Sequence, residues 1–219
     1  MKRIGDYLLS FKNQELILTP EKALFWINKK SLVLSDIHLG KSGHFRKSGI
    51  PIPTSVNDNN LERLDSLIKF FDPVRILFLG DLFHSDKNSE WEIFKTWRNK
   101  YSDIEMNLAI GNHDFHSPDE YEAIGLICSK NIESNPFLLL HDCQEINTEN
   151  NFYSISGHIH PSIRLTGKGK QTVRIPCFFF GANNAVLPAF GNFTGTHSLT
   201  PKTNDLVFGI TNDQIIQIL

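Results

Sequence analysis

Four short hydrophobic runs along this chain are each followed by polar residues of the types that bind metal ions. A nearly continuous hydrophobic run between turn residues is typical of a strand that is buried on both faces. The runs and the residues that follow them are 31–34 with Asp36 and His38, 74–79 with Asp81, 107–110 with Asn112, His113 and Asp114, and 153–156 with His158 and His160. We therefore predict four buried strands whose ends meet at one site, with Asp81 in its middle.

Helical spacing appears between these strands. Hydrophobic residues recur at every third or fourth position over 54–71, which predicts an amphipathic helix. A second helix is predicted from Ser89, and a third, shorter one from Ser117, with Pro118 in the first turn, where proline is tolerated. Beyond the run at 153–156 the helical spacing disappears. Further strands are predicted over 15–18, 23–27, 137–140, 171–175, 177–180, 206–210 and 214–219.

Strands that first alternate with helices and then follow one another predict a layered α/β sandwich. The chain has 219 residues, of which 40 % are hydrophobic and 11 % aromatic, so it can bury a substantial core. This length favours a single domain over residues 1–219. The formal net charge of −2 argues against a protein coated in basic residues, although it leaves room for a local basic groove.

The cysteines and the lack of long hydrophobic runs indicate the compartment. Cys128, Cys143 and Cys177 are scattered and form no C-x-x-C pair, which argues against a disulfide framework or a zinc knuckle. No hydrophobic run approaches the roughly 20 residues that a membrane span requires. We expect a soluble protein in the cytoplasm with no membrane partner.

The residue types at the strand ends indicate which metals they would bind. Each motif alone has an ordinary explanation as a turn or a cap, and His141, after the strand 137–140, is no exception. Together they place carboxylates, an amide and imidazoles at the ends of buried strands, where ligands bind in open α/β sheets. This mixture without thiolate suits Mn²⁺, Fe or Zn²⁺ better than Ca²⁺ or Mg²⁺. Two such ions about 3.5–4 Å apart, bridged by a carboxylate, can activate water for phosphoester hydrolysis.

The motifs together resemble those of a known family. Asp36-x-His38, Gly80-Asp81, Gly111-Asn112-His113-Asp114, His141 and Gly157-His158-x-His160 follow one another as they do in the calcineurin-like metallophosphoesterases. The resemblance implies a four-layer αββα sandwich, with two mixed sheets flanked by helices. It also implies that Asp36, His38 and His160 hold one metal, that Asn112, His141 and His158 hold the other, and that Asp81 bridges both. His113 would then be the acid that protonates the leaving oxygen.

Longer motifs resemble one branch of that family, the bacterial ligase-associated DNA damage response endonucleases. They are His-Leu-Gly-Lys-Ser-Gly-His-Phe-Arg at 38–46, Gly-Asp-Leu-Phe-His-Ser at 80–85, Gly-His-Ile-His-Pro at 157–161 and Leu-Pro-Ala-Phe-Gly at 187–191. The resemblance implies a DNA substrate and, as possible partners, a DNA ligase and a helicase. Phosphoprotein phosphatases carry an aspartate, which orients the catalytic histidine, where this chain has His84. Asp114 is the candidate for that orienting role here.

Basic residues close to the motifs are the candidates for holding a polyanion. We assign substrate binding to Lys41, His44, Arg46, His84, Arg164 and Lys168. Each could equally belong to an ordinary solvated loop, although loops at the ligand end of a sheet are well placed to contact phosphates. We predict a DNA endonuclease of DNA repair that uses two divalent ions, with Mn²⁺ preferred over Fe or Zn²⁺. The alternatives are a small-molecule phosphodiesterase or phosphatase and an inactive scaffold. The sequence does not indicate the oligomeric state.

Overall fold

The computed structural model describes residues 2–41, 55–84, 89–145, 152–167, 169–192 and 194–219. Its helical segments are η1 (Ile27–Lys29), α2 (Ser55–Phe71), α3 (Ser89–Lys100), α4 (Pro118–Glu122) and η2 (Cys143–Glu145). Its strands are β1 (Tyr7–Phe11), β2 (Gln14–Leu18), β3 (Leu24–Trp26), β4 (Ser31–Leu34), β5 (Arg75–Phe78), β6 (Glu105–Ala109), β7 (Leu126–Ser129), β8 (Asn131–Ser134), β9 (Phe137–Leu140), β10 (Tyr153–Ser156), β11 (Pro161–Thr166), β12 (Thr172–Phe180), β13 (Asn184–Val186), β14 (His197–Ser198), β15 (Leu206–Ile210) and β16 (Ile215–Gln217).

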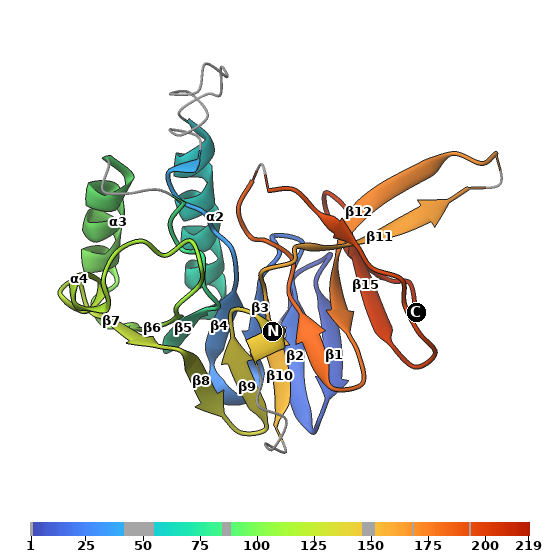
Figure 1. Ribbon diagram of the computed structural model, residues 1–219, viewed down its shortest axis with the longest axis horizontal. Coiled ribbons are helices and arrows are strands. Elements are labelled where there is room, and N and C mark those ends of the chain that lie inside the picture. Colours follow the sequence, from blue (N-terminus) through green and yellow to red (C-terminus); the bar gives the residue numbers. More distant parts are fainter. Residues whose placement is uncertain (1, 42–54, 85–88, 146–151, 168, 193) are drawn as a thin grey trace.

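The first sheet has the strand order β1-β2-β3-β4-β5-β6-β7. Strands β1 to β4 are antiparallel neighbours, whereas β4 to β7 run parallel to one another. Parallel neighbours need crossover connections, and the three α-helices lie in these connections. The helices pack their hydrophobic stripes on one face of this sheet, where Leu64, Leu67, Phe94 and Tyr121 are fully buried (Figure 1). All three predicted helices are therefore present.

The second sheet has the order β14-β11-β12-β13-β10-β9-β8, with β15 paired to β12 and β16 paired to β15. Its central strands β9, β10 and β13 are parallel neighbours. The two sheets pack face to face, and a second core fills the space between them. The rings of Trp26 and Phe137 meet across this core with centroids 4.9 Å apart. The predicted α/β sandwich of two mixed sheets is confirmed.

Two details of the strand prediction were wrong. The segments 171–175 and 177–180 form the single strand β12, which runs through Pro176. Proline is tolerated there because the strand changes partner at this point. Pro176 is opposite Ser162 of β11, and from Cys177 onward the strand pairs with β15. The prediction also missed the strands β1, β7, β8, β11, β13 and β14, most of which are short.

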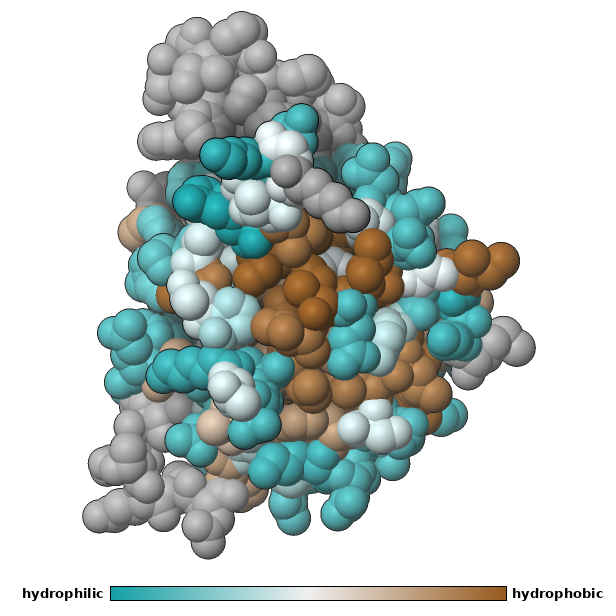
Figure 2. Space-filling view, turned by 90° about the vertical axis from the view of Figure 1, so that its right-hand side faces the viewer, coloured by the Kyte–Doolittle hydropathy of each residue, from teal (hydrophilic) through white to brown (hydrophobic). Residues whose placement is uncertain are grey.

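The three α-helices lie on the first sheet, and η2, beside β10, is too short to form a layer, so the described residues supply no helical layer over the second sheet. The outer face of the second sheet instead carries a small hydrophobic cluster around Ile163, Cys177 and Val207. The side of the molecule with β12 and β15 shows a hydrophobic area bordered by hydrophilic residues (Figure 2). None of the helices in the described ranges is long and hydrophobic enough to cross a membrane. The division into one domain stays a prediction.

Candidate metal centre

The predicted ligands lie where parallel strands of both sheets end. Strands β4, β5 and β6 of the first sheet lead into Asp36, Asp81 and Asn112. Strands β9 and β10 of the second sheet, also parallel, lead into His141 and His158. The carboxyl ends of parallel strands share one edge of a sheet, and here two such edges meet. The structure thus brings the predicted residues together.

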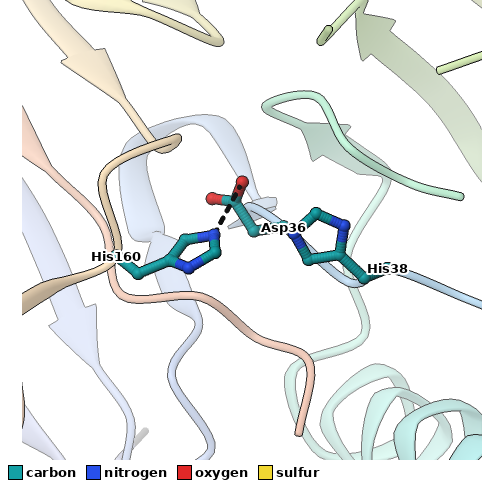
Figure 3. A group of neighbouring side chains, drawn as sticks. All are labelled: Asp36, His38 and His160. Atoms are coloured by element: carbon teal, nitrogen blue, oxygen red, sulfur yellow. Dashed lines mark ion pairs between the residues drawn. The ribbon is translucent and has the colours of Figure 1, made fainter. Parts of the chain in front are cut away.

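A first group consists of Asp36, His38 and His160, whose potential ligand atoms all lie within 4.8 Å of one another. Figure 3 shows the three side chains converging, with Asp36 Oδ1 3.3 Å from His160 Nε2. Asp36 Oδ1 and His160 Nε2 are both buried and have no hydrogen-bond partner. Buried polar atoms are nearly always satisfied in native proteins, so orphaned ligand atoms that face one another fit a cation between them.

The remaining atoms of this group are held by hydrogen bonds. His160 Nδ1 donates to the carbonyl oxygen of Gly195 at 2.9 Å, which leaves the Nε2 lone pair directed at Asp36. Asp36 Oδ2 accepts hydrogen bonds from the Ser35 hydroxyl and from the backbone N–H of His158, the latter at 3.0 Å. Partners of this kind fix the orientation of metal ligands.

A second group surrounds the imidazole of His141. Its Nε2 lies 2.9 Å from Asn112 Oδ1, 3.0 Å from His158 Nδ1 and 3.4 Å from Asp81 Oδ1. His141 Nδ1 donates to the carbonyl oxygen of Leu79 at 2.9 Å, so the neutral ring presents a lone pair at Nε2. Lone pairs of an imidazole, an amide and a carboxylate then crowd around one point. This arrangement also fits a cation.

Asp81 lies between the two groups. Its Oδ1 faces His141 of the second group, and its Oδ2 lies 3.7 Å from His38 Nε2 of the first. Asp36, Asp81 and His141 also bring ligand atoms within 4.8 Å of one another. A carboxylate with one oxygen toward each group has the geometry of a bridge between two ions.

The pKa shifts of two predicted ligands, His38 and Asp36, suit metal binding. Burial lowers the pKa of His38 to about 3, which keeps its imidazole neutral near pH 7. Burial alone would raise the pKa of Asp36, but His160, His141 and Ser35 outweigh it and lower that pKa. His160 differs from them: burial lowers its pKa, but Asp36 raises it by more, so a cation that binds there would displace a proton from the ring. Neutral imidazoles and ionised carboxylates are the forms that bind divalent ions.

The backbone of the site is strained. Five predicted ligands have positive φ angles between 48° and 69°, namely Asp36, His38, Asp81, His158 and His160. Two glycines allow the close packing around them. A Cβ on Gly80, whose φ is +78°, would lie 2.3 Å from His141 Nδ1, and one on Gly157 would lie 2.4 Å from Asp36 Oδ2. Strain of this kind concentrates at functional sites.

His113, the predicted acid, lies beside the two groups. Its backbone N–H donates to Asp81 Oδ1 at 2.9 Å, which places the half-buried ring next to the centre. The ring centroid is 5.6 Å from that of His38 and 5.1 Å from that of His84. The ring of His84, predicted to bind substrate, is also 5.2 Å from that of the predicted ligand His38, so it borders both His113 and the first group.

Asp114, the candidate for orienting His113, makes other contacts. Its carboxylate accepts backbone N–H bonds from Asp81 at 2.9 Å, Leu82 at 2.9 Å and Gly111 at 2.8 Å, and the Tyr121 hydroxyl donates to it at 3.1 Å. Burial raises the pKa of Asp114 to about 6. These contacts hold the loop that carries Asp81, and none in the described ranges joins the carboxylate to the His113 ring.

The other predicted substrate-binding residues differ in position. Burial lowers the pKa of Lys41, while Asp36 and Asp81 raise it, so the ammonium lies close enough to feel both carboxylates. Arg164 lies in β11, exposed and directly opposite Arg174 of β12. His44, Arg46 and Lys168 lie outside the described residues.

Three supporting residues had escaped the sequence analysis. Ser35, a polar residue at the end of a hydrophobic strand and next to Asp36, carried a signal that could have identified it. Tyr121 carried no such signal. Its hydroxyl binds Asp114, but the hydrophobic pattern of its helix explains an aromatic residue at this position equally well. Gly195 acts through its carbonyl oxygen, which every residue possesses.

Comparisons with known proteins agree with this geometry. The family model for the calcineurin-like phosphoesterases matches residues 29–179. The crystal structure of Pseudomonas putida nuclease MPE superimposes with a TM-score of 0.81 and 25 % sequence identity, covering 97 % of this chain and 100 % of that one.

Two other solved structures are less similar. A protein of unknown function from Aquifex aeolicus has a TM-score of 0.42 and 19 % identity over 59 % of this chain and 78 % of that one. Yfce, a phosphoesterase from E. coli, has a TM-score of 0.48 and 15 % identity over 86 % and 97 %. No curated protein sequence matches the chain.

Proposed function

Because the chain belongs to the calcineurin-like phosphoesterase family, we propose that it is a phosphodiesterase with two divalent metal ions that cuts DNA as a repair endonuclease. The observation that carries this proposal is the pair of ligand groups that share Asp81. Seven side chains from five strand ends converge there, more than one ion can use while keeping a position open for water. Such a centre suits displacement at phosphorus.

The residues of this chain would divide the work as follows. Asp36, His38 and His160 would hold one ion, Asn112, His141 and His158 the other, and Asp81 both. When bound, the two ions would lower the pKa of a water molecule and neutralise the phosphate oxygens. His113 would hold the proton that the leaving oxygen receives, since its backbone bond to Asp81 keeps the ring beside the centre. Asp114 would keep the Asp81 loop in place.

Support for DNA as the substrate comes from two observations. The structure most like this one among those compared above is described as a nuclease and matches over nearly the whole chain. In addition, Lys41 beside the centre and Arg164 on β11 offer positive charge to a polyanion. The preference for Mn²⁺, the cytoplasmic location and the association with a DNA ligase and a helicase rest on the sequence and stay predictions.

A substrate panel tests the proposal. Protein loaded with Mn²⁺ is offered single-stranded DNA, duplex DNA, RNA, a cyclic dinucleotide and a phosphomonoester, with Asp81→Asn as the inactive control. We expect cuts within DNA strands. Hydrolysis of only the cyclic dinucleotide or the phosphomonoester would establish the small-molecule alternative. No hydrolysis of any substrate with Mn²⁺, Fe²⁺ or Zn²⁺ would establish an inactive scaffold.

A further inference from the structure

Two adjoining cavities lie between the predicted ligand His160 and a second concentration of positive charge. The smaller, of about 120 Å³, is lined by His160 and by Lys22, Asn192, Thr194 and Thr196. The larger, of about 400 Å³, shares Lys22 and Asn192 with it and is also lined by Arg63. We call the two together the Lys22 recess. It leads from a predicted metal ligand to two cationic side chains.

Lys22 supplies an unneutralised charge to this recess. It lies in the turn between β2 and β3, where its backbone N–H donates to the carbonyl oxygen of Thr19 at 2.9 Å. No residue in the described ranges forms a hydrogen bond or ion pair with its ammonium group. Burial and the nearby charge of Arg63 lower the pKa of Lys22 to about 8. Lys22 is thus mostly charged at neutral pH, half-buried and beside another cation.

Arg63 supplies a second charge and holds the wall in place. Its guanidinium donates to the carbonyl oxygens of Glu21 at 2.9 Å and Phe190 at 2.7 Å, and to Asn192 Oδ1 at 3.2 Å. It also lies over the Phe190 ring, 4.2 Å from the centroid. These partners are neutral, so the positive charge remains. The carboxylate of Glu21, which lines the larger cavity, pairs with Arg3 at 2.6 Å, and Arg3 also pairs with Asp6 at 3.0 Å. The three cations Arg3, Lys22 and Arg63 still outnumber these two carboxylates.

The wall of the recess is continuous with the metal centre. Phe190 and Gly191 donate backbone N–H bonds to the carbonyl oxygens of Ser35 at 2.8 Å and Asp36 at 3.0 Å. The same segment continues to Gly195, whose carbonyl accepts from His160. A group seated in the recess would therefore lie at a fixed position relative to the first ligand group. The Lys22 ammonium and the Thr196 hydroxyl, which line this concave site, are donors suited to a phosphate.

We propose that the Lys22 recess binds the phosphate that neighbours the scissile one in a nucleic acid strand, with Lys22 as its direct ligand and Arg63 as a fixed supporting charge. This inference rests on the proposed function, since a small phosphomonoester has no neighbouring phosphate. The inference gives the turn before β3 a role in binding the nucleic acid strand. Consecutive phosphates of one strand would then occupy the metal centre and the recess.

The backbone offers a matched pair of test variants. Lys22 has a φ of +71° and Lys30 has a φ of +45°, both in the left-handed region that glycine adopts without strain. Lys22→Gly and Lys30→Gly therefore remove the same charge from similar backbone positions. Lys30 is exposed and directly precedes β4, at the end of the strand opposite Asp36. Lys22→Gln provides a second variant, which removes the charge but keeps a polar side chain only one atom shorter.

Binding is measured on the metal-loaded protein with a fluorescent single-stranded DNA oligonucleotide, in a His113→Ala background that slows cleavage. We expect Lys22→Gly and Lys22→Gln to weaken binding about tenfold, the loss typical for a hydrogen bond to a charged group. The log–log slope of binding against salt should become shallower by about 0.7, the value for one neutralised phosphate on a single strand. Lys30→Gly should match the parent in affinity, slope and melting temperature.

Activity measurements distinguish failure of this inference from failure of the proposed function. Without the His113 change, Lys22→Gly should lose several-fold more activity on DNA than on bis(4-nitrophenyl) phosphate, which has one phosphate. If the parent binds DNA and both Lys22 variants keep its affinity and slope, the inference is wrong and the proposed function stands. If the wild type neither binds nor cuts DNA yet hydrolyses the small ester, the DNA substrate is wrong, and the inference falls with it.

Discussion

The two groups of predicted metal ligands differ in how they are enclosed. Asp36 and His38, in the first group, are 0 % and 4 % exposed. In the second group Asn112 is exposed and the side chain of His158 is 36 % exposed, although His141 is buried. The side chain of His160, the third member of the first group, is 16 % exposed, less than half the value for His158. We therefore call the first group closed and the second open.

Their internal contacts differ in the same sense. In the closed group, Asp36 Oδ1 and His160 Nε2 are buried and have no hydrogen-bond partner. The open group already has close contacts among its own atoms, such as the 3.0 Å between His158 Nδ1 and His141 Nε2. A closed site with unsatisfied atoms should hold its ion tightly, since removing the ion exposes the full cost of unpaired buried groups. An open site should exchange its ion more easily and should admit the substrate.

Asp81→Asn should have the largest effect, because it removes the residue common to both groups. A neutral amide is a poor bridge between two cations. We expect both ions to bind more weakly by over about 100-fold, the upper end of the loss seen for outer-shell partners. Activity should be lost with them. Elemental analysis after reconstitution with Mn²⁺ should give two ions per chain in the wild type. One ion per chain that does not increase with added metal would contradict the bridging role.

His113→Ala should have the next largest effect and should spare both groups. Loss of a general acid typically lowers the rate about 10²–10⁴-fold. Because we assign His113 no bond to a metal, the variant should keep two ions per chain and the melting temperature of the wild type. The loss should be smaller for a substrate with a good leaving group, which needs little protonation. A variant that loses metal would show that His113 acts as a ligand.

The comparison itself is tested by removing one imidazole from each group. His38→Ala should leave the first position empty even with millimolar Mn²⁺. His158→Ala should recover its second ion and part of its activity as Mn²⁺ is added. Because the two groups differ in enclosure, we expect the affinity of His38→Ala for an ion at the first position to differ by about 10–100-fold from that of His158→Ala at the second. Calorimetric titration of the metal-free proteins measures both. Equal affinities would mean that enclosure does not distinguish the two positions.

Much of this site could be predicted from the sequence because strand ends and ligand types are local features. Asp36, Asp81 and Asn112 follow hydrophobic runs, and the topology of parallel strands brings such positions together. The helices could be predicted for the same reason, since α2 and α3 carry a plain helical spacing. The positions of His141 and His158 depended on a second sheet whose pairing the sequence did not indicate.

Contacts between distant segments could not be predicted. The carboxylate of Asp114 binds backbone amides of the Asp81 loop. Because every residue except proline has a backbone N–H, the sequence does not indicate which of them a carboxylate binds. Lys22 reaches the neighbourhood of His160 only through packing across 138 positions of the chain. Short strands such as β13 and β14 also lacked a signal, because two or three residues cannot show a period.

The smallest effects should come from the residues that support the two groups. Ser35→Ala removes the hydroxyl that donates to Asp36 Oδ2 in the closed group, at a site where Ser35 is 1 % exposed. We expect about a tenfold loss of affinity at the first metal position, the lower end for an outer-shell partner. Asp142 is the corresponding neighbour of the open group, with Oδ2 3.9 Å from His158 Nε2 and a partly exposed side chain.

That distance is too long for a hydrogen bond, and solvent screens the pair. Asp142→Asn should therefore change affinity at the second position by less than about threefold, because an exposed pair contributes little. Competitive titration of each variant with a chelator resolves these differences. Since Asp142→Asn also keeps the side-chain shape, it serves as the control for Ser35→Ala. If Asp142→Asn proves the more damaging, the open group depends on its surroundings more than the closed one, and the contrast between the two must be reversed.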